Sequence, residues 1–200
     1  MSLFLGPLDA ARRVPAGQQT RVAAFLLSCH GAMARQLALA LAWQVNPAWH
    51  IELNAQLFHE AEIVTLLSRA TCWTPDPDLL FLLPKWEIFW LPRPSEAIAD
   101  RAQGMIIDIV ALGHALHSVI RPAALLPQET AAQDPFALAL RKIEFESGRV
   151  LQAQIMFLKS ADLLPHRKSV TAAVEGRHLQ IRKLWQEMLA AIGVNRCESQ

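Results

Sequence analysis

The stretch "SEAIADRAQGMIIDIVALGHALHSVI", residues 95–120, decides the fold class, because it carries the signals for both ends of one long helix. Ser95 and Glu96 place a hydroxyl cap and a first-turn carboxylate at its start, where they suit the positive end of a helix. The residue before a proline is pushed away from helical geometry, so Pro122 ends the helix at Arg121. We therefore predict a helix of about seven turns here.

The same kind of punctuation divides the rest of the chain into four further helical blocks. Asp134 and Pro135 begin one of them, because the carboxylate caps the first turn and the missing N–H of proline costs nothing there. No alternating β-branched runs and no Asn-Gly hairpin indicate a sheet. The predicted helices cover about 18–44, 51–72, 95–121, 134–164 and 169–192.

Two of these blocks repeat apolar residues at helical spacing. The second helix is expected to bury a face made of Leu53, Leu57, Phe58, Ala61, Val64 and Leu67. The last helix has the three–four spacing of a helix-pairing seam, made of Val174, His178, Ile181, Trp185, Met188 and Ile192. We therefore predict an all-α fold: one domain over 1–200, an irregular bundle of about five helices.

The amino-acid composition limits the classes of fold and partner that the chain can have. With 52% hydrophobic and 18% charged residues, a chain of 200 residues is expected to fold into one packed globular domain. A formal net charge of +1 argues against a nucleic-acid partner, because a phosphate backbone requires a clustered positive excess.

The chain is expected to work in the cytoplasm. The most apolar run, residues 22–43, contains Arg35, which fits a buried core helix better than a transmembrane segment. The N-terminus has no basic region before its apolar residues, unlike a secretory signal. The three cysteines are far apart and form no disulfide framework or zinc motif, and Cys29 is predicted to be a buried structural thiol.

An aromatic, proline-rich connector at 73–94 is the most unusual segment. Its large rings have two interpretations, since they could plug one end of the bundle or stay exposed and anchor a partner. The residues predicted to bind a partner are Trp86, Phe89, Trp90 and Arg93 in this connector, with Trp185 in the last helix. The flexible joint of the chain is predicted at 122–133, between the third and fourth helices.

An alternative interpretation is a metal site in the helical bundle. The candidate ligands are His59, Glu62, His114 and His117, and the last two are spaced so that both can face one metal. Ferritin-like proteins add Glu-x-x-His pairs, which the helices carrying these four residues lack. The chain also has no P-loop, no GxSxG and no GxGxxG, so the sequence favours a protein without catalytic residues or a cofactor.

Two segments resemble the SctK/YscK family, the cytoplasmic accessory proteins of bacterial type III secretion systems. They are "LNAQLFHEAEI", residues 53–63, and "RPSEAIADR", residues 93–101. The first resembles the family through Leu53, Asn54, Ala55, Leu57 and Glu60, and the second through Pro94, Ser95 and Glu96 leading into a helix. The resemblance implies a helical, non-enzymatic protein that bridges the inner-membrane ring and the pod of the secretion sorting platform.

The leading hypothesis is thus a cytoplasmic adaptor, peripheral at the inner-membrane face, that acts by protein–protein contact. The alternative is a ferritin-like or haem-oxygenase-like metalloenzyme with a His/Glu metal site. A chaperone or a regulator is a third possibility, distinguished from the adaptor only by its partner.

Overall fold

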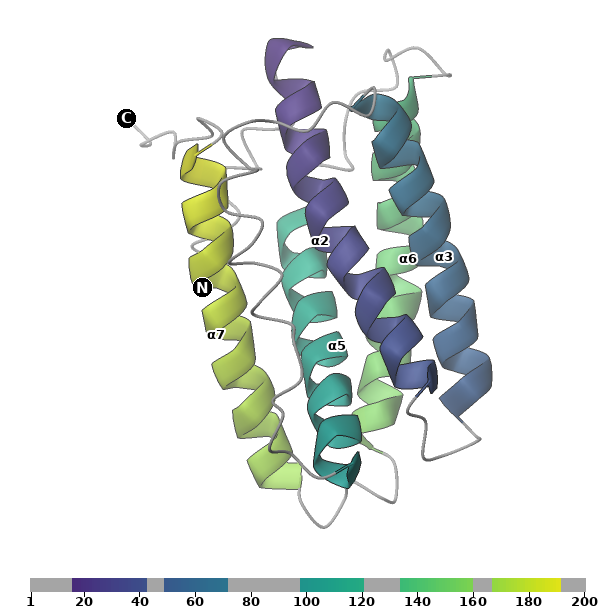
Figure 1. The fold of residues 1–200 in the computed structure, drawn as a ribbon, viewed down its shortest axis with the longest axis vertical. Helices are drawn as coiled ribbons and strands as arrows, with labels where there is room; N and C mark the ends of the chain where they lie inside the picture. Colours follow the sequence, from purple (N-terminus) through teal and green to yellow (C-terminus); the bar gives the residue numbers. More distant parts are fainter. Residues whose placement is uncertain (1–15, 43–48, 72–97, 121–133, 160–166, 192–200) are drawn as a thin grey trace.

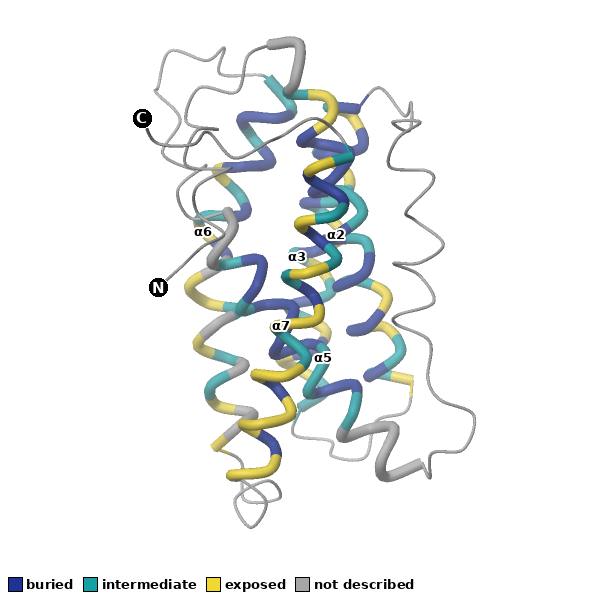
Figure 2. Tube along the Cα trace, turned by 90° about the vertical axis from the view of Figure 1, so that its left-hand side faces the viewer, coloured by how far each residue is buried: buried dark blue, intermediate teal, exposed yellow. Residues whose placement is uncertain are grey.

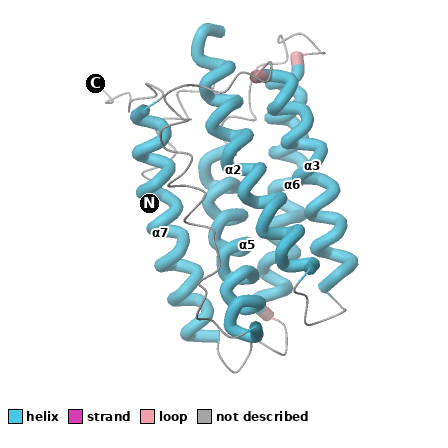
Figure 3. Tube along the Cα trace, in the orientation of Figure 1, coloured by secondary structure: helices cyan, strands magenta, loops and turns pink. Residues whose placement is uncertain are grey.

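The computed structural model describes residues 16–42, 49–71, 98–120, 134–159 and 167–191, and in these residues it has five helices and no strand (Figures 1 and 3). The prediction of an all-α bundle of about five helices is confirmed. The connector at 73–94 and the joint at 122–133 lie outside the described residues. The helices are α2 (Ala16–Ala42), α3 (His50–Ala70), α5 (Ile98–Ile120), α6 (Pro135–Leu158) and α7 (Arg167–Ala191).

Four of the helices close into a ring. Helix α2 packs against α3, α3 against α6, α6 against α5, and α5 back against α2. Neighbours around this ring run in opposite directions, whereas α7 lies outside it and runs parallel to α5 (Figure 1). The fold is therefore an antiparallel four-helix bundle with a fifth helix added to one side.

The start of α6 follows the sequence prediction. The backbone N–H of Phe136 donates to Oδ1 of Asp134 at 3.1 Å, and the N–H of Leu138 donates to the carbonyl of Asp134 at 2.9 Å. Pro135 is the first helical residue, where it has no N–H to leave unsatisfied. Asp134 is thus the N-cap that the sequence predicts.

The core draws apolar side chains from all five helices, and the buried residues face the inside of the bundle (Figure 2). Phe25 of α2 and Trp185 of α7 are both fully buried, and their rings meet edge to face with centroids 5.7 Å apart. The contact places α7 against α2 as well as α5. Cys29 is buried, as predicted, and this burial raises the pKa of its thiol well above the ordinary value.

Helix α2 is also long and apolar enough to cross a membrane: the segment Gln19–Ala42 passes by length and composition. Within this fold 61% of its most apolar window is buried against the other helices. A buried core helix of a globular bundle passes the same test, so this property alone does not distinguish the two environments.

The face of α3 that was predicted to be buried is rotated about the helix axis from the face that the structure buries. Phe58 is 62% exposed and Ala61 is exposed, although Leu53 and Leu67 are buried as expected. The error arose because apolarity was the only guide, whereas three polar side chains are buried on this helix. The face that is buried consists of Leu53, Gln56, Glu60, Ile63, Leu67 and Ser68.

The predicted seam of α7 is confirmed for four of its members, since Val174, Ile181, Trp185 and Met188 are buried. His178 of the same seam is half-buried, and Ile192 lies outside the described residues. Here apolar and buried positions coincide, because α7 packs on the bundle with one face only.

Candidate functional site

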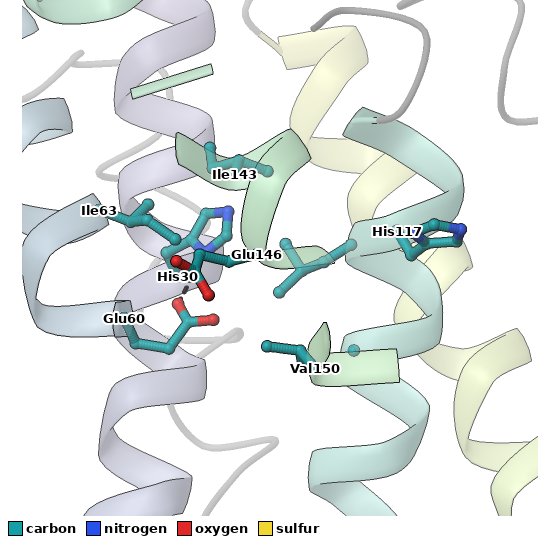
Figure 4. Close-up of a pocket in the computed structure, with 9 residues that line it drawn as sticks. His30, Glu60, Ile63, His117, Ile143, Glu146 and Val150 are labelled. Atoms are coloured by element: carbon teal, nitrogen blue, oxygen red, sulfur yellow. Dashed lines mark hydrogen bonds and ion pairs between the residues drawn. The ribbon is translucent and has the colours of Figure 1, made fainter. Parts of the chain in front are cut away.

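A buried contact between a histidine and a carboxylate joins α2 and α3 inside the ring. Nδ1 of His30 lies 2.7 Å from Oε2 of Glu60, and the two side chains are only 3% and 5% exposed. In Figure 4 the two residues point toward each other from their helices, with Glu146 of α6 beside them. Helix α2 presents His30 here because the histidine lies on the same side of the helix as Val22, Leu26 and Met33, which are also buried.

The polar centre borders a small cavity of about 20 Å³. That volume has room for about one water molecule and is too small for an organic substrate or a haem. Nε2 of His30 is buried and has no hydrogen-bond partner among the described residues. The cavity is lined from all four ring helices, by His30, Glu60, Ile63, Gly113, Leu116, His117, Ile143, Glu146 and Val150 (Figure 4).

A network of charges connects α3 to α6. Nζ of Lys142 lies 2.7 Å from Glu62 and 3.4 Å from Glu146, and His59 approaches Glu146 at 3.3 Å. Arg149 adds a fourth contact, 3.6 Å from Glu146. Lys142 lowers the pKa of Glu62, and that carboxylate in turn raises the pKa of Lys142. The buried carboxylate of Glu146 therefore has cationic groups around it.

A second polar contact joins α5 to α7. The guanidinium of Arg177 holds both oxygens of Asp108, through Nε at 2.6 Å and Nη2 at 3.3 Å. Near this pair, burial lowers the pKa of His114, with a smaller effect from His117. Burial also lowers the pKa of His178, followed by the charges of Arg182 and His114. Both imidazoles thus favour the neutral form at this interface.

We expect the protein to lose stability on mild acidification. Because folding lowers the pKa of His114 and His178 from about 6.5, the unfolded chain binds these protons more readily. These two histidines therefore do not reduce the free energy of unfolding above about pH 6.5. The free energy of unfolding decreases as the pH falls from about 6.5 toward their lowered pKa values in the folded protein. The urea midpoint, followed by circular dichroism, should be lower at about pH 5.5 than at about pH 7.5.

The variant His178→Gln removes one of these two histidines. The difference between its urea midpoints at about pH 5.5 and about pH 7.5 should therefore be smaller than in the unaltered protein. Glu62 does not contribute to this difference between the two pH values. Its pKa is lowered in the folded protein, so its contribution to stability is lost only when the pH falls below the ordinary pKa of a glutamate, about 4. An equal midpoint at both pH values, or an unchanged difference in His178→Gln, contradicts the prediction.

The four predicted metal ligands do not form one site. His59 and Glu62 belong to the α3/α6 network, His117 lines the cavity, and His114 lies near His178 of α7. Within the described helices, no group of three His, Cys, Asp or Glu side chains is placed to hold a metal ion. The i, i+3 spacing of His114 and His117 on α5 therefore does not by itself make a metal site in the described helices.

The predicted partner-binding residues have two different outcomes. Trp86, Phe89, Trp90 and Arg93 lie outside the described residues. Trp185, by contrast, is fully buried against Phe25, so its ring is not on the surface for a partner to contact. The prediction that Trp185 binds a partner is therefore corrected: it fills the space between α7 and the ring because a large ring is most stable in the core.

Sequence reasoning named Glu60 for the resemblance of 53–63, but it did not predict that Glu60 meets His30 beside Glu146 in a buried centre. One signal was available. His30 and Gln36 interrupt a long apolar run, and both are buried in the structure. A polar residue inside an apolar run is expected to have a buried partner, but the run does not say which residue that partner is.

Comparison with known proteins leaves these residues to be interpreted on their own. The chain matches no family model, no curated protein and no solved structure. No residue role is therefore transferred from a relative.

Proposed function

We propose that this chain is a non-enzymatic adaptor that acts by protein–protein contact. The observation that supports the proposal is a set of large apolar side chains left exposed on the helices of a well-packed bundle. Four of them lie on α3 and α6: Ile51 (82% exposed), Phe58 (62%), Phe145 (71%) and Met156 (59%). Leu179 (63%) is exposed singly on α7 and is not part of the proposed contact surface. Large apolar side chains exposed on neighbouring helices favour contact with another molecule, because their burial stabilises the complex.

The cavity is consistent with a protein whose chemistry lies on its surface. Its roughly 20 Å³ takes no substrate larger than about one water molecule. Two buried polar groups of the described helices are paired across helix contacts: His30 with Glu60, and Glu146 with His59 and Lys142. Such pairs are typical of groups that specify how helices pack.

We further propose that the adaptor is an accessory component of a type III secretion sorting platform, in the cytoplasm at the inner-membrane face. The support is the resemblance of 53–63 and 93–101 to the SctK/YscK family. Its partners are then the ring and pod components of that apparatus. Two residues that contribute to the resemblance, Leu53 and Glu60, are buried, which favours a shared helix packing as the origin of the likeness.

The test is affinity capture of the tagged full-length chain from the cell that naturally makes it, with the captured proteins identified and quantified by mass spectrometry. We expect stoichiometric recovery of secretion-apparatus components. Trp86→Ala with Trp90→Ala should reduce this recovery and leave the circular dichroism spectrum unchanged, whereas Leu179→Ala serves as an exposed-site comparison.

Recovery of the chain alone contradicts the adaptor role. Recovery with a single secreted protein favours a chaperone instead. Purification without chelator followed by elemental analysis tests the metalloenzyme, since a stoichiometric transition metal would contradict the proposal.

A further inference from the structure

The exposed side of α6 is basic and apolar. Six exposed residues recur along it every three or four positions and so lie on one side of the helix. No carboxylate of the described residues of α6 is exposed: Glu146 is buried and Glu144 is half-buried. Figure 2 shows α6 at one edge of the bundle with exposed residues along it. The six residues are Arg141, Phe145, Arg149, Gln152, Met156 and Lys159.

Helix α3 continues this surface with the same chemistry. Ile51 and Phe58 are seven residues apart, which is two helical turns, so they lie on one exposed side together with Arg69. The exposed carboxylate Glu52 points about 100° away from Ile51 around the helix. Glu62, the other partly exposed acid, is already paired with Lys142.

Ion pairs set the register of the two helices. Glu62 meets Lys142 and His59 meets Glu146, so α3 and α6 are antiparallel and side by side over this length. Phe58 precedes His59, and Phe145 precedes Glu146, which brings both phenylalanines to the same level of the pair. Ile51 then lies toward the end of α6 that carries Met156. The two exposed sides therefore form one continuous surface.

We propose that this α3/α6 outer face, made of Ile51, Phe58, Arg141, Phe145, Arg149 and Met156, docks an acidic amphipathic helix of a partner protein. The inference rests on the proposed adaptor function and gives its partner a chemistry. Apolar side chains two and three turns apart, at the spacings of Ile51–Phe58 and Phe145–Met156, match anchors at i, i+7 and i+11 on one side of a helix laid alongside. Exposed arginines with no exposed acid beside them on α6 are complementary to carboxylates that flank such anchors.

An anionic membrane is the rival occupant, and the geometry favours the protein helix. A membrane-binding surface inserts one dense apolar face into the lipid boundary. Here the four apolar side chains lie in two short rows, about 10 Å long on α3 and about 17 Å long on α6, and Arg149 interrupts the row on α6. The spacing suits the ridges of a helix better than the flat interface of a bilayer.

The probe is a synthetic amphipathic peptide of about 20 residues, long enough at about 1.5 Å per residue to span α3. It carries leucine at i, i+3, i+4 and i+7 positions and glutamate elsewhere. A second peptide replaces every glutamate with lysine. We expect the acidic peptide to bind the full-length protein in fluorescence anisotropy and the lysine peptide to bind at least about 10-fold more weakly.

Two double variants locate the site. Arg141→Gln with Arg149→Gln, and separately Phe58→Ser with Phe145→Ser, should each weaken binding of the acidic peptide about 10-fold or more. The arginine charges are removed rather than reversed because Arg149 lies 3.6 Å from the buried carboxylate of Glu146. All four side chains are exposed, so melting temperature should stay near that of the unaltered protein. Leu179→Ser is the matched control, an exposed apolar residue on α7 whose loss should leave binding unchanged.

Equal binding of both peptides, or full binding by either double variant, overturns the proposal. Vesicles of phosphatidylglycerol and phosphatidylcholine form a separate arm, and binding to them without binding to the acidic peptide also overturns it. In native-cell capture, a Phe58→Ser/Phe145→Ser chain that retains its partner refutes this face and leaves the adaptor role standing. An unaltered chain that captures nothing refutes the adaptor role itself.

Discussion

Replacing Trp185 with alanine is expected to lower the free energy of unfolding by about 3–5 kcal/mol. The indole is fully buried and meets Phe25 edge to face, so the variant loses both apolar burial and an aromatic pair. Domains of this kind are stable by only about 5–15 kcal/mol, so this one change removes a large share. Urea denaturation followed by circular dichroism measures the loss.

Two comparisons make the result specific to the core position. Trp185→Phe keeps an aromatic ring and should lose clearly less stability than the alanine variant. Leu179→Ala, on the same helix but exposed, should stay within about 0.5 kcal/mol of the unaltered protein. A Trp185→Ala variant with unchanged stability would return Trp185 to the list of surface anchors.

Replacing Glu60 alone with leucine should cost about 3–5 kcal/mol, although leucine is the more hydrophobic residue. The change removes the partner of His30, whose second ring nitrogen already has no hydrogen bond among the described residues. A buried polar group without a partner keeps its full desolvation penalty. His30→Leu alone should be similarly harmful, because it leaves the buried Glu60 carboxylate without its counter-group.

The double variant His30→Leu with Glu60→Leu separates this explanation from simple loss of packing. Since it removes both polar groups together, it should be more stable than either single variant. Additive losses, with the double variant the least stable of the three, would mean that the two residues act independently.

The fold class was within reach of the sequence because its signals are local. The Asp134–Pro135 start of α6 and the apolar spacing of α7 depend only on residues within a few turns. Both were predicted correctly. The rotation of α3 was not, because a scale of apolarity cannot anticipate that Glu60 and Gln56 are buried while Phe58 is exposed.

The candidate sites were less predictable, since each depends on which helices become neighbours. The histidines predicted as metal ligands are well spaced on α5, yet His114 lies near α7 and His117 lines the cavity. Tryptophan is a residue type that often anchors a partner at a surface, but Trp185 lies in the core. In both cases residue type indicated what the side chain can do, and packing decided what it does.

The sequence by itself thus determined which segments of the described residues are helices and that none of them is a strand, because caps, prolines and periodicity act over a few residues. Only the tertiary structure decided that α2, α3, α6 and α5 close into a ring around His30 and Glu60, and that one side of α3 and α6 stays basic and apolar. The physical reason is that a buried polar group requires a partner from another helix, and an exposed apolar one results from helices packing elsewhere.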